Sequence, residues 1–191
     1  MLDTTFRLPF LQQLEAVNPD APSCTIDFRI AWHEKGLAFS LEVLGKTLPV
    51  WCRHSQPEAS DGLQLCIDTR DVRNVHRATR YCHRIILLPG DAKMKEERAG
   101  AIWLPIHRAK DHPNSVAVER IVTKCEFGDN GYKLEAVMPA DVLTGYEPNE
   151  YNRLGLHYVI ADRELGNKYL TTPSPLPHDC DPSLWATLEL V

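Results

Sequence analysis

The stretch Asp61–Pro89, DGLQLCIDTRDVRNVHRATRYCHRIILLP, decides the fold of this chain. Every second residue of its first part is a large aliphatic residue: Leu63, Leu65 and Ile67. The residues between them face the other way: Gln64, Cys66 and Asp68. Because successive side chains of a strand point to opposite faces, this alternation predicts a half-buried strand with one wet face.

A second alternating segment, residues 81–88, follows after a polar connection. Its two faces carry His83, Ile85 and Leu87, and Cys82, Arg84, Ile86 and Leu88. The connection is strongly basic and contains four arginines: Arg70, Arg73, Arg77 and Arg80. Two interpretations stay open. The connection is either a solvated loop tied down by Asp68, Asp71 and nearby glutamates, or a pocket for an anion or a sugar acid, since the guanidinium fork suits carboxylates and phosphates.

The same period of two recurs along the chain, most clearly in residues 24–32, 36–44, 132–138 and 153–162. Shorter or less regular strands are expected at 48–53, 101–107, 115–127 and 184–191. Turn signals separate these segments, above all GDNG at 128–131. About ten short strands without a convincing amphipathic helix predict an all-β fold, an antiparallel two-sheet β-sandwich that is jelly-roll-like.

No repeat, low-complexity tract or linker divides the chain of 191 residues. We therefore expect a single β-sandwich domain over residues 24–191. Residues 1–23 contain Pro9, Pro19 and Pro22 around a short apolar segment. This pattern predicts an N-terminal arm with one or two helical turns.

The composition is that of an ordinary globular protein, with 43% hydrophobic and 25% charged residues. The net charge of −5 argues against a general nucleic-acid binder, which needs a basic surface to neutralise phosphates. No apolar run is long enough to span a bilayer, so no membrane association is expected. The N-terminus lacks the features of a secretory signal, and the six cysteines are widely spaced. We interpret them as reduced thiols of a cytoplasmic protein.

Four segments carry a resemblance to a known family: DGLQLCIDTR (61–70), GYKLEAVMP (131–139), LGLHYVIAD (154–162) and DPSLWATLEL (181–190). In this order they resemble the strand signatures of family 9 carbohydrate-binding modules and of the wider group of DOMON-like β-sandwich domains. Together they span residues 61–190, roughly two thirds of the chain.

The resemblance implies a sugar site on one face of a sheet. Gln64 stands where the family has an acidic hydrogen-bonding residue, and Arg84 stands near the family's strand arginine. The family clamps a terminal sugar between two tryptophans, because the C–H face of a pyranose packs on an aromatic ring while its hydroxyls reach polar side chains. The matching segments of this chain, residues 55–60 and 175–178, contain no tryptophan, and Trp185 matches a core aromatic.

All four tryptophans lie in strand-like context, where core packing is the default: Trp32, Trp51, Trp103 and Trp185. Trp51 and Trp103 lie near proline-marked loops, so either could be exposed and serve as a stacking platform. The candidate ligand-binding residues are therefore Gln64, Arg84, Trp103, Trp51 and Asp68.

Two kinds of metal site are conceivable, although we predict no required cofactor. The acidic residues at expected strand ends could hold a structural calcium ion, which prefers oxygen ligands: Asp61, Asp68, Asp71 and Asp162. Asp68 is more readily paired with Arg70 or a neighbouring arginine, which would keep it ionised. A transition metal could bind His76, Cys82 and His83, although no histidine pair has a tight metal-binding spacing.

No catalytic motif is present: the sequence has no G-x-S-x-G, no glycine-rich phosphate loop and no selected carboxylate pair. Only Cys82, beside His83 and arginines, could have a lowered pKa. We predict a non-catalytic module that recognises a sugar or related polar ligand on the sheet face of Gln64 and Arg84. The alternative is a cytoplasmic structural or interaction domain of the same fold, which has lost sugar binding and works with a protein partner.

Overall fold

The alternating segments form two antiparallel sheets in the computed structural model, which describes residues 24–90, 98–113, 115–171 and 176–191. The first sheet has the strand order β1-β2-β7-β6, with the bounds Thr25–His33 (β1), Gly36–Leu44 (β2), Gly131–Pro139 (β7) and Val122–Gly128 (β6). The two alternating segments 24–32 and 36–44 form a β-hairpin, since Thr25 pairs with Leu44 and His33 with Gly36.

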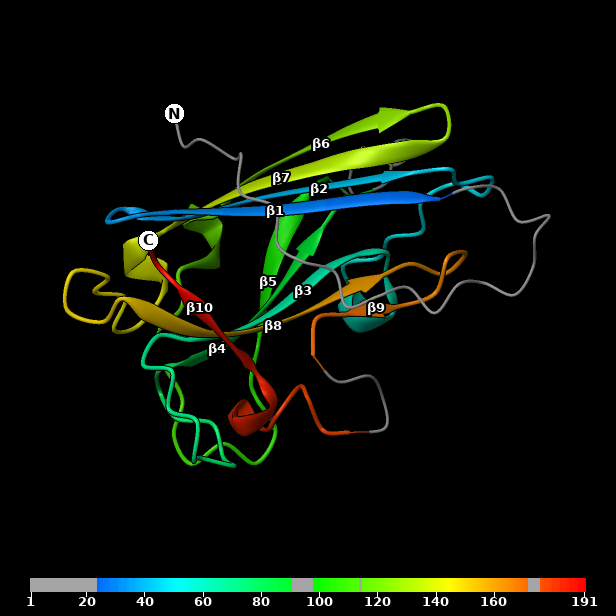
Figure 1. Cartoon of the computed structure of the whole chain (residues 1–191). Coiled ribbons are helices and arrows are strands. Elements are labelled where there is room, and N and C mark those ends of the chain that lie inside the picture. The colour runs from blue at the N-terminus through cyan, green and yellow to red at the C-terminus, as the bar shows by residue number, and fades with distance from the viewer. Residues whose placement is uncertain (1–23, 91–97, 114, 172–175) are drawn as a thin grey trace.

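The second sheet has the order β10-β8-β3-β4-β5, with β9 paired to β8. Its strands are Ala186–Glu189 (β10), Arg153–Ala161 (β8), Gly62–Asp68 (β3), Cys82–Leu88 (β4), Gly100–Leu104 (β5) and Lys168–Tyr169 (β9). Figure 1 shows the two sheets as facing layers, with the four-stranded sheet at the top of the view. The predicted antiparallel two-sheet sandwich of about ten strands is confirmed.

Helical structure in the described ranges is limited to single 3-10 turns: Pro57–Ala59 (η1), Val118–Arg120 (η2), Ala140–Val142 (η3) and Pro182–Leu184 (η4). None of these turns approaches the length and apolarity of a membrane span. Residues 1–23, for which we expected an arm with a helical segment, lie outside the described residues. That a single domain spans residues 24–191 stays a prediction.

The main core lies between the two sheets. Leu63, Leu65 and Ile67 are buried in it, as their alternation predicts. Phe28 of the opposite sheet packs edge-on against Tyr158, with ring centroids 4.6 Å apart. Each such side chain removed from water contributes roughly 1.5–3 kcal/mol to folding.

The outer face of the six-stranded sheet is covered at both ends by loops. At one end Cys52 lies over Ile86 and Leu88. At the other end Trp185, Ala78 and Ile106 cover Cys66 and Cys82. Gln64 and Arg84 lie on this face between the two covered ends, which makes their surroundings the place to examine for a ligand.

Two strand predictions are wrong. Residues 48–53 form no strand, because side chains take over their backbone hydrogen bonds: Asp61 accepts from the Trp51 amide, and Ser60 accepts from the Arg53 amide. The single long strand expected at 115–127 is interrupted by η2 and begins only at Val122. The alternation of apolar residues in a sequence does not indicate where a side chain will bind the backbone or where a 3-10 turn will interrupt a strand.

Candidate functional site

Gln64 and Arg84 lie on neighbouring strands and share the outer face of the six-stranded sheet. Gln64 of β3 pairs with Ile86, and Arg84 of β4 pairs with Cys66, so the two side chains are diagonal neighbours. Glu58 of η1 joins them. The Gln64 side-chain amide donates to the Glu58 carbonyl at 3.1 Å, and the Arg84 guanidinium donates to the Glu58 carboxylate at 2.6 Å.

A second carboxylate approaches Arg84 from the loop before β10. Asp179 lies 3.7 Å from the Arg84 guanidinium, whose side chain is only 12% exposed. Glu58, by contrast, is 60% exposed, so its ion pair with Arg84 is a surface interaction of about 0–1 kcal/mol that a ligand can replace. The space above Gln64 and Arg84 is therefore lined by carboxylates rather than by a stacking ring.

Three rings gather on the other side of Cys66. His157 of β8 also pairs with Cys66, so it lies across this residue from Arg84. Its ring is 4.8 Å from the ring of His178 and 6.5 Å from that of Tyr169. The His178 carbonyl accepts a hydrogen bond from the Trp185 indole at 2.7 Å, which fixes the loop that carries His178.

His157 is fully buried at the base of this group. Burial and the neighbouring His178 lower the pKa of His157 to about 3, so its imidazole is neutral near pH 7. Nδ1 of His157 is hydrogen-bonded to the Thr171 hydroxyl at 2.7 Å, while Nε2 has no protein partner among the described residues. A buried ring nitrogen left without a partner is costly, and a ligand hydroxyl could satisfy it.

We call these residues the outer-face cluster: Glu58, Gln64, Arg84, His157, Tyr169, His178 and Asp179. They come from six separate parts of the chain: η1, β3, β4, β8, β9 and the loop before β10. Sequence analysis identified only Gln64 and Arg84. The alternation of residues 154–162 could have placed His157 on the same face, but nothing in the sequence indicates that Glu58 and Asp179 converge on Arg84.

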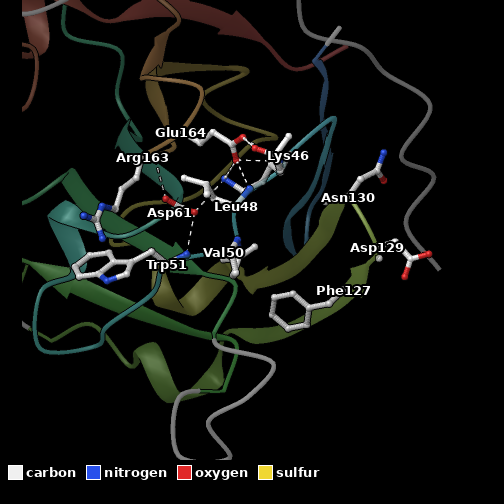
Figure 2. Close-up of a pocket in the computed structure, with 14 residues that line it drawn as sticks. Lys46, Leu48, Val50, Trp51, Asp61, Phe127, Asp129, Asn130, Arg163 and Glu164 are labelled. Carbon is white, nitrogen blue, oxygen red and sulfur yellow. Dashed lines mark hydrogen bonds and ion pairs between the residues drawn. The ribbon is translucent and has the colours of Figure 1, made fainter. Parts of the chain in front are cut away.

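Trp51 lies elsewhere, in the groove of Figure 2 at one end of the sandwich. This end groove has a volume of about 700 Å³ and is lined by Trp51, Phe127 and Leu48 together with polar residues. The Arg163 guanidinium lies 4.4 Å from the centre of the Trp51 ring. Trp51 therefore does not join Gln64 and Arg84, although it does line a concave surface of a size suited to small ligands.

A buried ammonium group lies at the base of the end groove (Figure 2). Lys46 Nζ is 2.5 Å from Asp162, 3.3 Å from Asp61 and 3.8 Å from Glu164. The side chains of Lys46, Asp61 and Asp162 are each at most 2% exposed. The ammonium group thus contacts two of the four carboxylates considered for calcium.

The other two carboxylates, Asp68 and Asp71, lie at the far end of β3. Over the described residues, no three His, Cys, Asp or Glu side chains are grouped to hold a metal ion. The four acidic residues proposed for calcium are therefore divided between the two ends of the sandwich.

The expected ion pair between Asp68 and Arg70 is not formed, and this prediction is wrong. The Asp68 carboxylate accepts hydrogen bonds from the backbone amides of Arg70 and Val72. Burial raises its pKa, because the charged form loses solvation. The Arg70 guanidinium instead contacts Glu147 at 3.0 Å. Asp68 therefore fixes the turn after β3 and is not presented to a ligand.

Trp103 is also on the wrong face for a site with Gln64 and Arg84. It lies on β5 opposite Ile85, whose side chain is in the main core, and it packs against that core. Its indole nitrogen is buried. The strand expected within residues 101–107 is present as β5, but the sequence alone does not reveal which of its side chains face inward.

The transition-metal hypothesis fails on geometry, because His83 and Cys82 point to opposite faces of β4. His83 is in the interior, where burial lowers its pKa to about 4. Burial raises the pKa of Cys82 to about 12, opposite to the lowered pKa that its neighbours in the sequence made conceivable. His76 lies on the exposed loop and contacts Asp181.

No family model and no curated protein sequence matches this chain. Its structure does match solved structures. A family 9 carbohydrate-binding module from Caldicellulosiruptor kristjanssonii in complex with cellotriose aligns with a TM-score of 0.62 and 14% identity, covering 87% of this chain and 75% of that chain. The same kind of module from that organism in complex with glucose aligns with a TM-score of 0.61 and 13% identity, covering 87% and 76%. This chain therefore has the fold of a family 9 carbohydrate-binding module.

Proposed function

We propose that this protein is a non-catalytic carbohydrate-binding module whose ligand binds the outer-face cluster. The observation that carries the proposal is the convergence of Gln64, Arg84 and His157 on one sheet face. Each offers a hydrogen-bonding group suited to a sugar hydroxyl. The similar structures bound to glucose and cellotriose support the same ligand class.

The chemistry of the cluster fits a sugar held mainly by hydrogen bonds. Arg84 supplies donors and Glu58 and Asp179 supply acceptors, while the rings of Tyr169 and His178 offer a modest apolar contact. Without a pair of tryptophans the buried aromatic area is small. We therefore expect weak binding, with a dissociation constant of roughly 0.1–1 mM.

Isothermal titration against glucose, cellotriose and a panel of other sugars tests this proposal. In Arg84→Gln the affinity should fall at least tenfold, since losing a hydrogen bond to a charged group costs about 1.5–3 kcal/mol. His178→Ala should also weaken binding, because it removes part of the apolar ring contact. Lys133→Gln is the matched control: Lys133 is an exposed partner of Glu135 on the four-stranded sheet. Melting curves of all variants would verify folding. No heat with any sugar, or equal binding by Arg84→Gln, would refute the proposal.

The alternative is a cytoplasmic structural or interaction domain that keeps the sandwich and has lost sugar binding. The ion pairs of Arg84 with Glu58 and Asp179 support it, because they satisfy the guanidinium without a ligand. None of the six cysteines, all of which lie among the described residues, forms a disulfide, which supports a reducing compartment. Absence of sugar binding together with specific capture of one protein, lost on Arg84→Gln, would favour this alternative.

A further inference from the structure

A second concave surface lies at the opposite end of the sandwich from Lys46. We call it the tyrosine–arginine pocket. It has a volume of about 480 Å³ and is lined by Arg70, Val72, Thr79, Arg80, Tyr81, Lys110, Asp111 and Tyr151. These residues come from the basic connection after β3, the loop after β5 and the segment before β8.

Arg70 and two tyrosines form a fixed wall of this pocket. The Arg70 guanidinium lies 3.7 Å from the ring centre of Tyr151 and 4.8 Å from that of Tyr81. It donates to the Gly145 carbonyl at 2.9 Å and to Glu147 at 3.0 Å. Gly145 has φ +77, and a side chain there would approach the Tyr81 ring to 2.7 Å, so only glycine allows this packing.

The cations around the pocket are largely left without carboxylate partners. Arg73 donates to the Thr187 hydroxyl, Arg77 to the carbonyls of Arg108 and Ala109, and Arg80 to the Tyr81 hydroxyl at 3.1 Å. All of these acceptors are neutral. Of the lining cations Arg70 is paired with Glu147, whereas the exposed Asp111 is the carboxylate that lines the pocket with Arg80 and Lys110. The basic connection is thus held partly by neutral oxygens and partly by carboxylates, since Asp68 accepts from the amides of Arg70 and Val72 and Arg70 contacts Glu147.

We propose that the tyrosine–arginine pocket is a second binding site, for a small organic anion that carries a carboxylate, sulfate or phosphate group on a ring. The anionic group binds between Arg80 and Lys110, whose side chains are exposed. The ring packs on Tyr151 and Val72, which are 37% and 38% exposed. A cation facing an aromatic wall suits such a ligand better than a neutral sugar, because the anion gains charge-assisted hydrogen bonds.

Nuclear magnetic resonance titration of the full chain with glucose 6-phosphate, glucuronate, inorganic phosphate and glucose tests this assignment. The two ring-bearing anions should shift the signals of Tyr81, Lys110 and Tyr151, and glucose should leave them unchanged. Because the contact is between exposed charges, raising the ionic strength from about 0.05 to about 0.5 M should weaken anion binding several-fold.

Two variants isolate the parts of the pocket. Arg80→Gln combined with Lys110→Gln should lower the affinity for both ring-bearing anions at least tenfold. The control, Lys124→Gln combined with Lys133→Gln, makes an equal charge change on the four-stranded sheet and should change these affinities less than twofold. Tyr151→Ala should weaken glucose 6-phosphate but not inorganic phosphate.

Three results would overturn the proposal: no shifts at the pocket with any anion, equal binding by the Arg80 and Lys110 double variant, or equal affinity for inorganic phosphate and glucose 6-phosphate. The outcome is separable from sugar binding at the outer-face cluster, because Arg84→Gln should leave the shifts of Tyr81 and Tyr151 intact.

Discussion

Lys46 and Asp162 form a fully buried ion pair, with 2.5 Å between the ammonium nitrogen and the carboxylate. Asp162 lies just after β8 and Lys46 just after β2, so the pair joins the two sheets at one end of the sandwich. Asp61 shares the same ammonium group and also binds the amides of Trp51 and Arg163. The loops at this end are therefore organised around one cation.

Lys46→Met should destabilise the protein strongly. The substitution leaves the Asp61 and Asp162 carboxylates buried without their cation, and breaking a buried pair in this way costs about 3–5 kcal/mol. Urea unfolding measures the loss. Lys124→Met, which breaks the exposed pair of Lys124 with Glu126, should cost about 1 kcal/mol or less. Equal stabilities of the two variants would contradict this interpretation.

Calcium and chelators should leave the melting temperature unchanged. Lys46 already occupies the position between Asp61 and Asp162, and Asp68 is occupied by two backbone amides. Thermal melts in millimolar calcium chloride and in EDTA check this directly. A melting temperature that rises with calcium and returns with EDTA would show that the acidic residues do bind the ion.

Stability should fall as the pH is lowered below about 6.5. Burial depresses the pKa of His83 to about 4 and that of His157 to about 3 in the folded protein. Between these values and the ordinary 6.5, the unfolded chain binds protons that the folded chain does not. Each histidine therefore lowers the free energy of unfolding by about 1.4 kcal/mol for every unit by which the pH falls within this range.

His83→Leu tests one of these two contributions without touching the outer-face cluster. The unfolding free energy of the native protein, taken relative to that of this variant, should fall as the pH falls from about 6.5 to about 4. Comparing the two proteins cancels the contributions that other titrating groups make to the pH dependence of stability. One of these groups is Asp68, whose raised pKa makes the protein more stable, not less, as the pH falls. A constant difference across this range would show that His83 is not a buried neutral imidazole.

Gly131→Ala should be far more costly than Gly128→Ala, although both glycines flank the same turn. A methyl group at Gly131 would lie 1.9 Å from the Val43 carbonyl oxygen, whereas one at Gly128 would meet nothing closer than 3.9 Å. We expect a loss of about 2–4 kcal/mol for Gly131→Ala and about 1 kcal/mol or less for Gly128→Ala. Chemical denaturation of both variants provides the comparison.

The sequence predicted the architecture well because one face of each strand is buried. Leu63, Leu65 and Ile67 lie inside and Gln64 lies on the outer face, as their period of two requires. Prediction failed where a side chain replaces a strand partner, as Asp61 does for Trp51. It also failed for Trp103, since alternation indicates two faces without indicating which one is inside.

Only some residues of the outer-face cluster could be predicted from the sequence, and the reason differs from the one that applies to the strands. Gln64 and Arg84 lie on adjacent strands close in sequence, and their motif drew attention to them. Glu58 and Asp179 reach Arg84 from loops that are far apart along the chain. Contacts of that kind depend on how the loops close over the sheet, and no local pattern encodes them.

The scattered origin of the outer-face cluster has a consequence for folding experiments. Arg84 and His157 become neighbours only after β4 and β8 have both paired with β3, and His178 arrives only when Trp185 is packed. A partly assembled chain lacking any of these pairings would present no complete receptor surface. Recovery of ligand affinity during refolding would therefore report the last stage of assembly, later than signals that follow strand formation alone.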